Sequence, residues 1–144
     1  MLNAVGNKNW FLTEYEGLDA VPFLVDLAKK IKTFRYPLEN FANWLVENIN
    51  NPNVKIHIVV QGEKIVGFGI AEISYELDIP FIAIQVGYVP PEIKGGVDEW
   101  MKQLKEWAKD SDIHTIRMKV IRHMEGWEKK YGFEIENYTL KKEV

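Results

Sequence analysis

The stretch FIAIQVGYVPPEIKGGVDEW, residues 81–100, decides the fold of this chain. Its first nine residues are mostly apolar and rich in β-branched and aromatic side chains, which is typical of a strand. Pro90 and Pro91 end this strand because neither can donate a ladder hydrogen bond. Gly95 and Gly96 then lead into a helix. A helix begins with unpaired N–H groups and a partial positive charge, so this strand, loop and helix predict an anion-binding site.

The residues after the loop continue the alternation of helix and strand. Apolar side chains recur at helical spacing over residues 97–109, and a second apolar strand is predicted over residues 113–120. A short helix over residues 124–131 and a last strand over residues 133–140 complete the C-terminal part. The helical stripe consists of Val97, Met101, Leu104 and Ala108, flanked by Trp100 and Trp107.

The residues before the stretch predict a sheet with two helices. Leu18, Val21, Val25 and Ala28 recur on one face of a first helix, and a second helix follows Pro37. The whole order is β-α-α-β-β-β-α-β-α-β, an α/β fold with one mixed sheet in a single domain, residues 1–144. The further predicted elements are strands over residues 9–15, 54–60, 65–73 and 79–89, a helix over residues 38–49, and a polar connection over residues 75–78.

Composition excludes several classes of protein. Lys plus Arg number 18 and Asp plus Glu 21, without a basic cluster, which argues against nucleic-acid binding. No apolar run approaches the roughly 18 residues of a membrane span, and no signal peptide is visible, so we expect a cytoplasmic protein. The chain has no cysteine, and His57, His114 and His123 lack the spacing of a metal site, so we expect no bound metal.

Two motifs resemble those of one enzyme family. V-P-P-E-I-K-G-G, residues 89–96, is similar to the pattern V-x-P-x-x-[RQ]-G-x-G-x-G/A at its valine, its second proline and its first glycine. W-E-K-K-Y-G-F, residues 127–133, is similar to F-Y-x-K-x-G-F at Lys130, Gly132 and Phe133. With the order of elements, they resemble the GNAT superfamily, the Gcn5-related N-acetyltransferases that use acetyl coenzyme A.

The resemblance implies a binding site for acetyl coenzyme A along this stretch. In the family, backbone groups of the strand pair with the pantetheine arm, and amides of the loop bind the pyrophosphate. A diphosphate at a helix N-terminus needs exposed amides and close approach of the backbone, which glycine permits. The residues implied are Gly87, Tyr88 and Val89 for the arm, and Lys94, Gly95, Gly96 and Val97 for the pyrophosphate.

Departures from the family pattern leave the catalytic residues open. The loop is shorter than the family's, and the tyrosine that serves the family as general acid falls at Glu128. A glutamate protonates a departing thiolate only if burial raises its pKa. Gln85 stands where many members carry a carboxylate, so Glu72 on the preceding strand is the candidate general base. Tyr88, beside the implied cofactor site, is a further candidate acid.

The sequence supports two hypotheses of different classes. The first is an enzyme that transfers an acetyl group to an amine, of a small molecule or a protein, mainly through proximity and polarisation by strand amides. The second is a GNAT-like module with attenuated catalysis, acting as a homo-oligomer or within a larger assembly such as a viral particle. The motif matches favour the first hypothesis. The short loop, Gln85, Glu128 and the five tryptophans favour the second.

Overall fold

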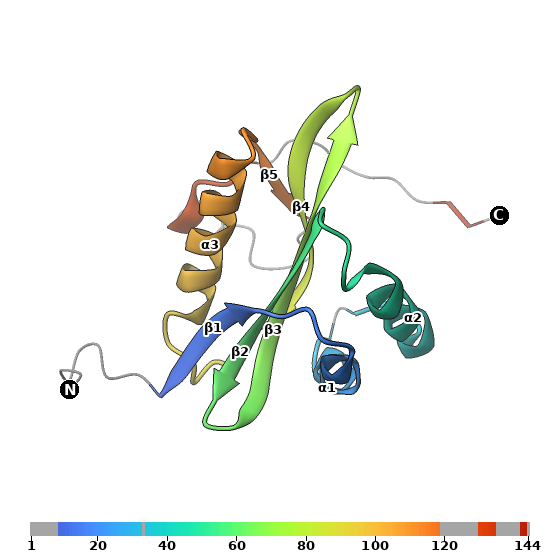
Figure 1. Cartoon of the computed structure of the whole chain (residues 1–144), viewed down its shortest axis with the longest axis vertical. Coiled ribbons are helices and arrows are strands. Elements are labelled where there is room, and N and C mark those ends of the chain that lie inside the picture. The colour runs from blue at the N-terminus through green and yellow to red at the C-terminus, as the bar shows by residue number, and fades with distance from the viewer. Residues whose placement is uncertain (1–8, 33, 119–129, 135–141, 144) are drawn as a thin grey trace.

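The computed structural model describes residues 9–32, 34–118, 130–134 and 142–143. That part of the chain forms a five-stranded sheet in the order β1-β2-β3-β4-β5 (Figure 1). Neighbouring strands are antiparallel except β4 and β5, which are parallel. The strands are β1 (Trp10–Glu14), β2 (Val54–Gln61), β3 (Lys64–Glu76), β4 (Ile79–Tyr88) and β5 (Ile116–Met118).

Helices cover both faces of the sheet. Helices α1 (Val21–Ala28), preceded by the short 3₁₀ helix η1 (Leu18–Ala20), and α2 (Leu38–Asn48) lie on one face, and α3 (Gly96–Asp110) lies on the other (Figure 1). The predicted mixed α/β fold is therefore confirmed. Lys130 and Tyr131 are helical, but most of the predicted helix over residues 124–131 and of the strand over residues 133–140 lies outside the described residues.

The two larger of three core clusters among the described residues lie on opposite faces of the sheet, because side chains alternate along each strand. In the first core cluster, α1 and α2 pack on β2 and on Phe68 and Ile70 of β3. In the second, α3 packs on Ala71 of β3 and Ile82 of β4. The adjacent residues Ile70 and Ala71 are both fully buried, one in each cluster. The strand β3 is thus shared by the two halves of the interior.

The first helix buries the predicted stripe except at its first residue. Leu18 is 55% exposed, whereas Leu24 and Leu27, which the prediction did not include, are buried. Leu18 lies in the 3₁₀ helix η1, which has fewer residues per turn than an α-helix, so the α-helical period does not extend back to it. Val21 and Ala28 are buried as predicted.

Two predicted boundaries are also wrong. The polar connection over residues 75–78 is a two-residue turn, in which Leu77 and Asp78 have φ values of 51° and 66°. Both values are left-handed, as tight hairpin turns require. The last described strand begins at Ile116 and not at Ile113, because the Ile113 N–H donates to the Ala108 carbonyl at 2.8 Å and so completes the end of α3.

Trp100 of α3 lies directly against two glycines of the sheet. A Cβ atom on Gly69 would come within 2.3 Å of Trp100 Cε2, and one on Gly87 within 2.9 Å of Trp100 Cζ3. Beside this contact, the pairing of β3 with β4 shifts register between Ile70 and Ala71. Glycine is needed at both positions because the indole occupies the space of any side chain.

Arg117 of β5 joins three strands at the end of β4 that is remote from the loop. Its guanidinium carbon lies 4.2 Å from the ring centroid of Phe81 on β4, and its Nη1 donates to Glu76 Oε2 on β3 at 3.0 Å. The contact crosses β4 and holds β3, β4 and β5 together at this end of the sheet.

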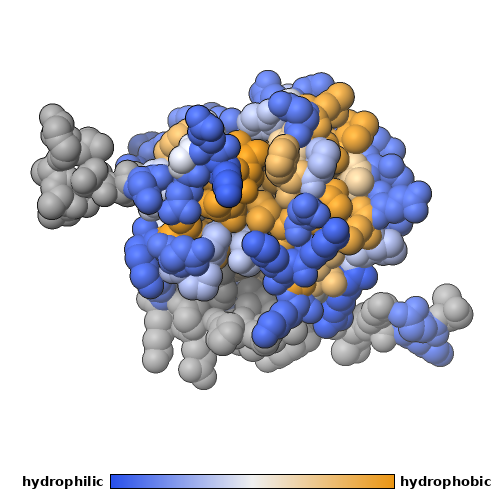
Figure 2. Space-filling model, turned by 90° about the horizontal axis from the view of Figure 1, so that it is seen from below, coloured by the Kyte–Doolittle hydropathy of each residue, from blue (hydrophilic) through white to orange (hydrophobic). Residues whose placement is uncertain are grey.

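Some large apolar side chains remain exposed, among them Phe23 on α1 and Val46 on α2. On the lower face of the molecule, apolar residues gather among hydrophilic ones (Figure 2). Exposed apolar side chains are ordinary on protein surfaces, so they give no argument for a partner. No helix within the described ranges is long and apolar enough to cross a membrane.

Candidate functional site

Residues 89–95 connect β4 to α3 in a tight loop. The Ile93 N–H donates to the Pro90 carbonyl at 3.0 Å, and the Gly96 N–H donates to the Ile93 carbonyl at 3.3 Å. Ile93 is buried and so anchors the loop. Gly95 is the N-cap of α3 with φ 82°, a left-handed conformation that glycine adopts without strain.

The amides at the start of α3 remain available to a ligand. Within the described residues, the N–H groups of Lys94, Gly95 and Val97 donate to no backbone acceptor. Unpaired amides at a helix N-terminus carry the positive end of its dipole. Gly96 lets the loop close tightly, because a Cβ atom there would lie 2.7 Å from Val89 Cγ1. The geometry therefore suits an anionic group, and the residues implied by the resemblance fit a diphosphate.

The loop surrounds a small hollow of about 220 Å³, here called the loop hollow. Its walls are residues 89–91 and 93–97 together with Asp98 and Lys130. The lining thus contains two cationic side chains, Lys94 and Lys130, and one carboxylate, Asp98. The excess of positive charge adds to the helix dipole and favours an anion.

Asp98 is held by two residues from the C-terminal part of the chain. Tyr131 Oη donates to Asp98 Oδ1 at 2.6 Å, and Lys130 Nζ lies 3.3 Å from the same oxygen. The hydrogen bond from Tyr131, together with Lys130, lowers the pKa of Asp98. Burial and the contact with Asp98 raise the pKa of Tyr131, and the hydrogen bond to Asp98 raises the pKa of Lys130. Lys130 is therefore a firmly positive group beside the loop hollow.

One edge of β4 next to the loop, here called the free edge, has no partner strand among the described residues. β5 pairs with β4 only at Ile82, Ala83 and Ile84. The described residues place no strand beside residues 85–88 on that edge, and Gln85 and Gly87 are exposed there. Unpaired backbone groups on a strand edge can bind an extended ligand. The structure thus brings the predicted residues Gly87, Tyr88 and Val89 next to the predicted loop residues.

Glu72 and Gln85 form a hydrogen-bonded pair where this free edge begins. Gln85 Nε2 donates to Glu72 Oε1 at 2.6 Å. Glu72 is half-buried and lies on the face of α1 and α2, because Ile70 two residues earlier belongs to the first core cluster. The amide thus orients the carboxylate, and Glu72 Oε2 makes no hydrogen bond within the described residues. The sequence analysis singled out both residues, but it did not predict the hydrogen bond between them.

Tyr88, a candidate acid, lies apart from Glu72. Its ring packs against the first core cluster, and Lys30 Nζ lies 5.9 Å from the ring centroid. Tyr88 pairs with Phe68, four residues before Glu72 on β3. At roughly 3.3 Å per residue, about 13 Å of strand separates the two positions. Glu128, the other candidate acid, lies outside the described residues.

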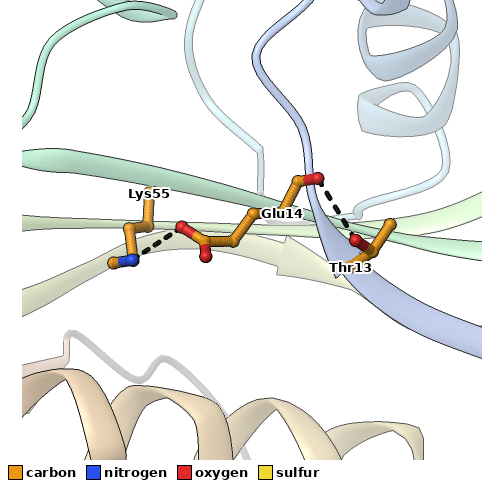
Figure 3. A network of polar contacts seen from close by, with 3 residues as sticks. All are labelled: Thr13, Glu14 and Lys55. Carbon is orange, nitrogen blue, oxygen red and sulfur yellow. Dashed lines mark hydrogen bonds and ion pairs between the residues drawn. The ribbon is translucent and has the colours of Figure 1, made fainter.

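A second polar cluster lies under α3, away from the loop. Lys55 Nζ donates to Glu14 Oε1 at 2.6 Å, and the Thr13 hydroxyl lies 3.4 Å from the Glu14 carbonyl (Figure 3). Lys55 Nζ is also 5.2 Å from the centroid of the Trp107 ring. His57, two residues further along β2, is 2% exposed, and burial lowers its pKa to about 4. Within the described ranges, no group of three potential metal ligands comes together.

The fold is that of the GNAT acetyltransferases. A predicted acetyltransferase from Clostridium acetobutylicum, solved with acetyl-CoA, is 15% identical with a TM-score of 0.77, over 93% of this chain and 96% of that one. AAC(6')-Iy, in complex with the bisubstrate analogue CoA-S-monomethyl-acetylneamine, is 13% identical with a TM-score of 0.76, over 95% of this chain and 99% of that one.

A third similar structure is the aminoglycoside 6'-N-acetyltransferase AAC(6')-Ih from Acinetobacter baumannii. It is 13% identical with a TM-score of 0.74, over 94% of this chain and 99% of that one. No protein-family model matches the sequence, and no curated protein matches it. At these identities the likeness concerns the fold alone.

Proposed function

We propose that this chain is an acyltransferase that uses acetyl coenzyme A and acetylates an amine. The observation that carries the proposal is the set of unused amides at the start of α3, which lies beside the free edge of β4. A diphosphate and an extended arm are the two features that such a surface would bind. Two of the similar structures contain acetyl-CoA or a coenzyme A analogue.

Each part of the site has its own role in the proposal. The amides of Lys94, Gly95 and Val97 hold the diphosphate, and the edge at residues 87–89 orients the arm. When bound, acetyl coenzyme A supplies an acetyl group activated as a thioester. Glu72, oriented by Gln85, acts as general base: it takes a proton from the substrate ammonium, and the neutral amine so formed attacks the thioester carbonyl. The acid that would protonate the leaving thiolate stays unassigned among the described residues.

Isothermal titration with acetyl coenzyme A tests the proposal. We expect the unmodified chain to bind, and Gly95→Ala to weaken binding by about tenfold or more, because a Cβ atom would enter the loop hollow. Gly62→Ala is a matched control. Gly62 also has a positive φ and open space around it, but it lies in the turn between β2 and β3.

The two glycine variants separate binding from stability. Both should lose similar stability through backbone strain, whereas only Gly95→Ala should lose affinity. No heat from the unmodified chain would refute the enzyme and favour the structural or interaction module. If both variants bind acetyl coenzyme A with equal affinity, the diphosphate does not bind at the loop that contains Gly95. The amine is sought by following thiol release from acetyl coenzyme A with a panel of primary amines.

A further inference from the structure

Trp100 connects the two parts of the proposed site. It belongs to α3 and lies four residues after Gly96, so about 6 Å of helix separates it from the amides at the helix start. Its indole packs on Gly87, a residue of the free edge of β4. One side chain thus joins the helix proposed to bind the diphosphate to the strand proposed to bind the arm.

The indole of Trp100 spans two neighbouring strands. Gly87 on β4 pairs directly with Gly69 on β3. A Cβ atom on Gly87 would lie 2.9 Å from Cζ3 of the indole, and one on Gly69 would lie 2.3 Å from Cε2, at the opposite corner of the six-membered ring. The ring therefore bridges both strands, and the contact with their backbone sets how closely α3 approaches the sheet.

Stability alone does not explain this arrangement. Glycine in the interior of a strand weakens the strand, and here two glycines stand opposite each other. The indole Nε1 is buried and has no hydrogen-bond partner within the described residues, which also costs stability. Met101 and Leu104 of the same helix are buried without any such cost. Local rules of stability are broken mainly where a function requires it.

We propose that Trp100 is a positioning residue, which fixes the spacing between a diphosphate subsite at the start of α3 and an arm subsite on the free edge. The inference rests on the proposed function and adds a residue that acts through the backbone, since its side chain is only 4% exposed. Two linked groups of a ligand gain affinity from each other only when their spacing matches that of the subsites. A smaller side chain at this position therefore weakens a ligand that spans both subsites and spares a ligand that occupies one.

Titrations with acetyl coenzyme A and with ADP, followed by NMR chemical shifts, test the inference, because ADP carries a diphosphate without the arm. We expect Trp100→Phe to weaken the binding of acetyl coenzyme A about tenfold, while the affinity for ADP stays within about twofold. Trp107→Phe is the matched control. It shortens a half-buried aromatic side chain of the same helix and core cluster, away from both glycines, and should leave both affinities unchanged.

Gly69→Ala tests the same spacing from the side of the sheet. Its new Cβ atom meets the indole of Trp100, although Gly69 belongs to neither subsite. We expect this variant also to weaken acetyl coenzyme A and to spare ADP. The double variant Trp100→Phe/Gly69→Ala should lose less affinity than the two single losses combined, because the smaller ring leaves room for the methyl group.

The outcomes separate this inference from the proposed function. If Trp100→Phe binds acetyl coenzyme A as tightly as the unmodified chain, or loses affinity for both ligands equally, Trp100 does not set the spacing and acyl transfer still stands. Binding of acetyl coenzyme A without binding of ADP would remove the diphosphate subsite and, with it, this inference. If neither ligand binds the unmodified chain, both proposals fail together.

Circular dichroism shows whether each variant is folded under the conditions of the titrations. If Trp100→Phe does not fold, Gly69→Ala decides by the same criterion. A loss confined to acetyl coenzyme A supports the spacing, and an equal loss for both ligands, or no loss, overturns it.

Discussion

Among single residues, Glu72 is the one on which the proposed chemistry depends most. Glu72→Gln keeps the shape and the hydrogen bond with Gln85, but it removes the group that accepts a proton. We expect amine acetylation to slow by about 100-fold, as for loss of a general base, with unchanged affinity for acetyl coenzyme A. Initial rates of thiol release measure this. Glu63→Gln in the β2–β3 turn is the control, and an unchanged rate in Glu72→Gln would remove Glu72 from the mechanism.

His57 should make the stability of the fold depend on pH. Its pKa is about 4 in the folded chain, below the ordinary value of 6.5, because burial disfavours the charged ring. The unfolded chain therefore binds more protons between these values. The full contribution of neutral His57 to the free energy of unfolding is present above about pH 6.5. The free energy of unfolding then falls by roughly 3 kcal/mol as the pH drops to about 4.

Urea unfolding between pH 7 and pH 4 measures the contribution of His57. His57→Leu should reduce the fall of the free energy of unfolding between pH 7 and pH 4. We expect leucine to be tolerated at this buried position, because His57 Nδ1 has no hydrogen-bond partner in the described residues. His114→Gln, at a side chain that is 85% exposed, should leave the decline unchanged. A decline as steep in His57→Leu as in the unmodified chain would assign the acid sensitivity to other groups.

Among the elements, α3 and the sheet are coupled through Trp100. Gly69→Ala should destabilise the fold by about 1–3 kcal/mol, because the new Cβ atom would lie 2.3 Å from the indole. In a Trp100→Leu background the same change should cost almost nothing. In a Trp107→Leu background it should keep its full cost. Free energies of urea unfolding for the six chains measure the coupling, and additive costs would show that the contact is relaxed.

The same elements show how far the sequence could predict the fold and the site. Residues 81–100 predicted β4, the loop and α3 because each signal is local: an apolar run, two prolines and an amphipathic period. The turn at Leu77 and Asp78 was not predictable, because a bulky residue such as Leu77 rarely adopts a left-handed conformation, although aspartate is common there. Tertiary pairing, not local preference, decides that turn.

The candidate site also has parts that the sequence predicts and parts that it does not. The glycines of the loop were visible from the motif, since their spacing is a property of the chain. The pairs Glu72–Gln85 and Asp98–Lys130 were not, because they join residues 13 and 32 positions apart and depend on strand register and helix placement. The polar and charged side-chain pairs were thus the least predictable part of the site, since they depend on which elements lie side by side after folding.

For the molecule as a whole, the two core clusters should unfold together. They share β3, whose adjacent residues Ile70 and Ala71 are buried on opposite faces. Loss of either cluster exposes one face of the strand that supports the other, so a single cooperative transition is expected. Far-ultraviolet circular dichroism and tryptophan fluorescence should give coincident urea curves. Two separated midpoints would contradict the prediction of one domain over residues 1–144.

The Arg117 contact strengthens the weakest pairing of the sheet. β5 pairs with β4 at only three positions among the described residues. Because Arg117 contacts both Phe81 of β4 and Glu76 of β3, its side chain fastens this short strand to two other strands at once. A substitution of Arg117 would therefore loosen β5 without touching the loop at the other end of β4.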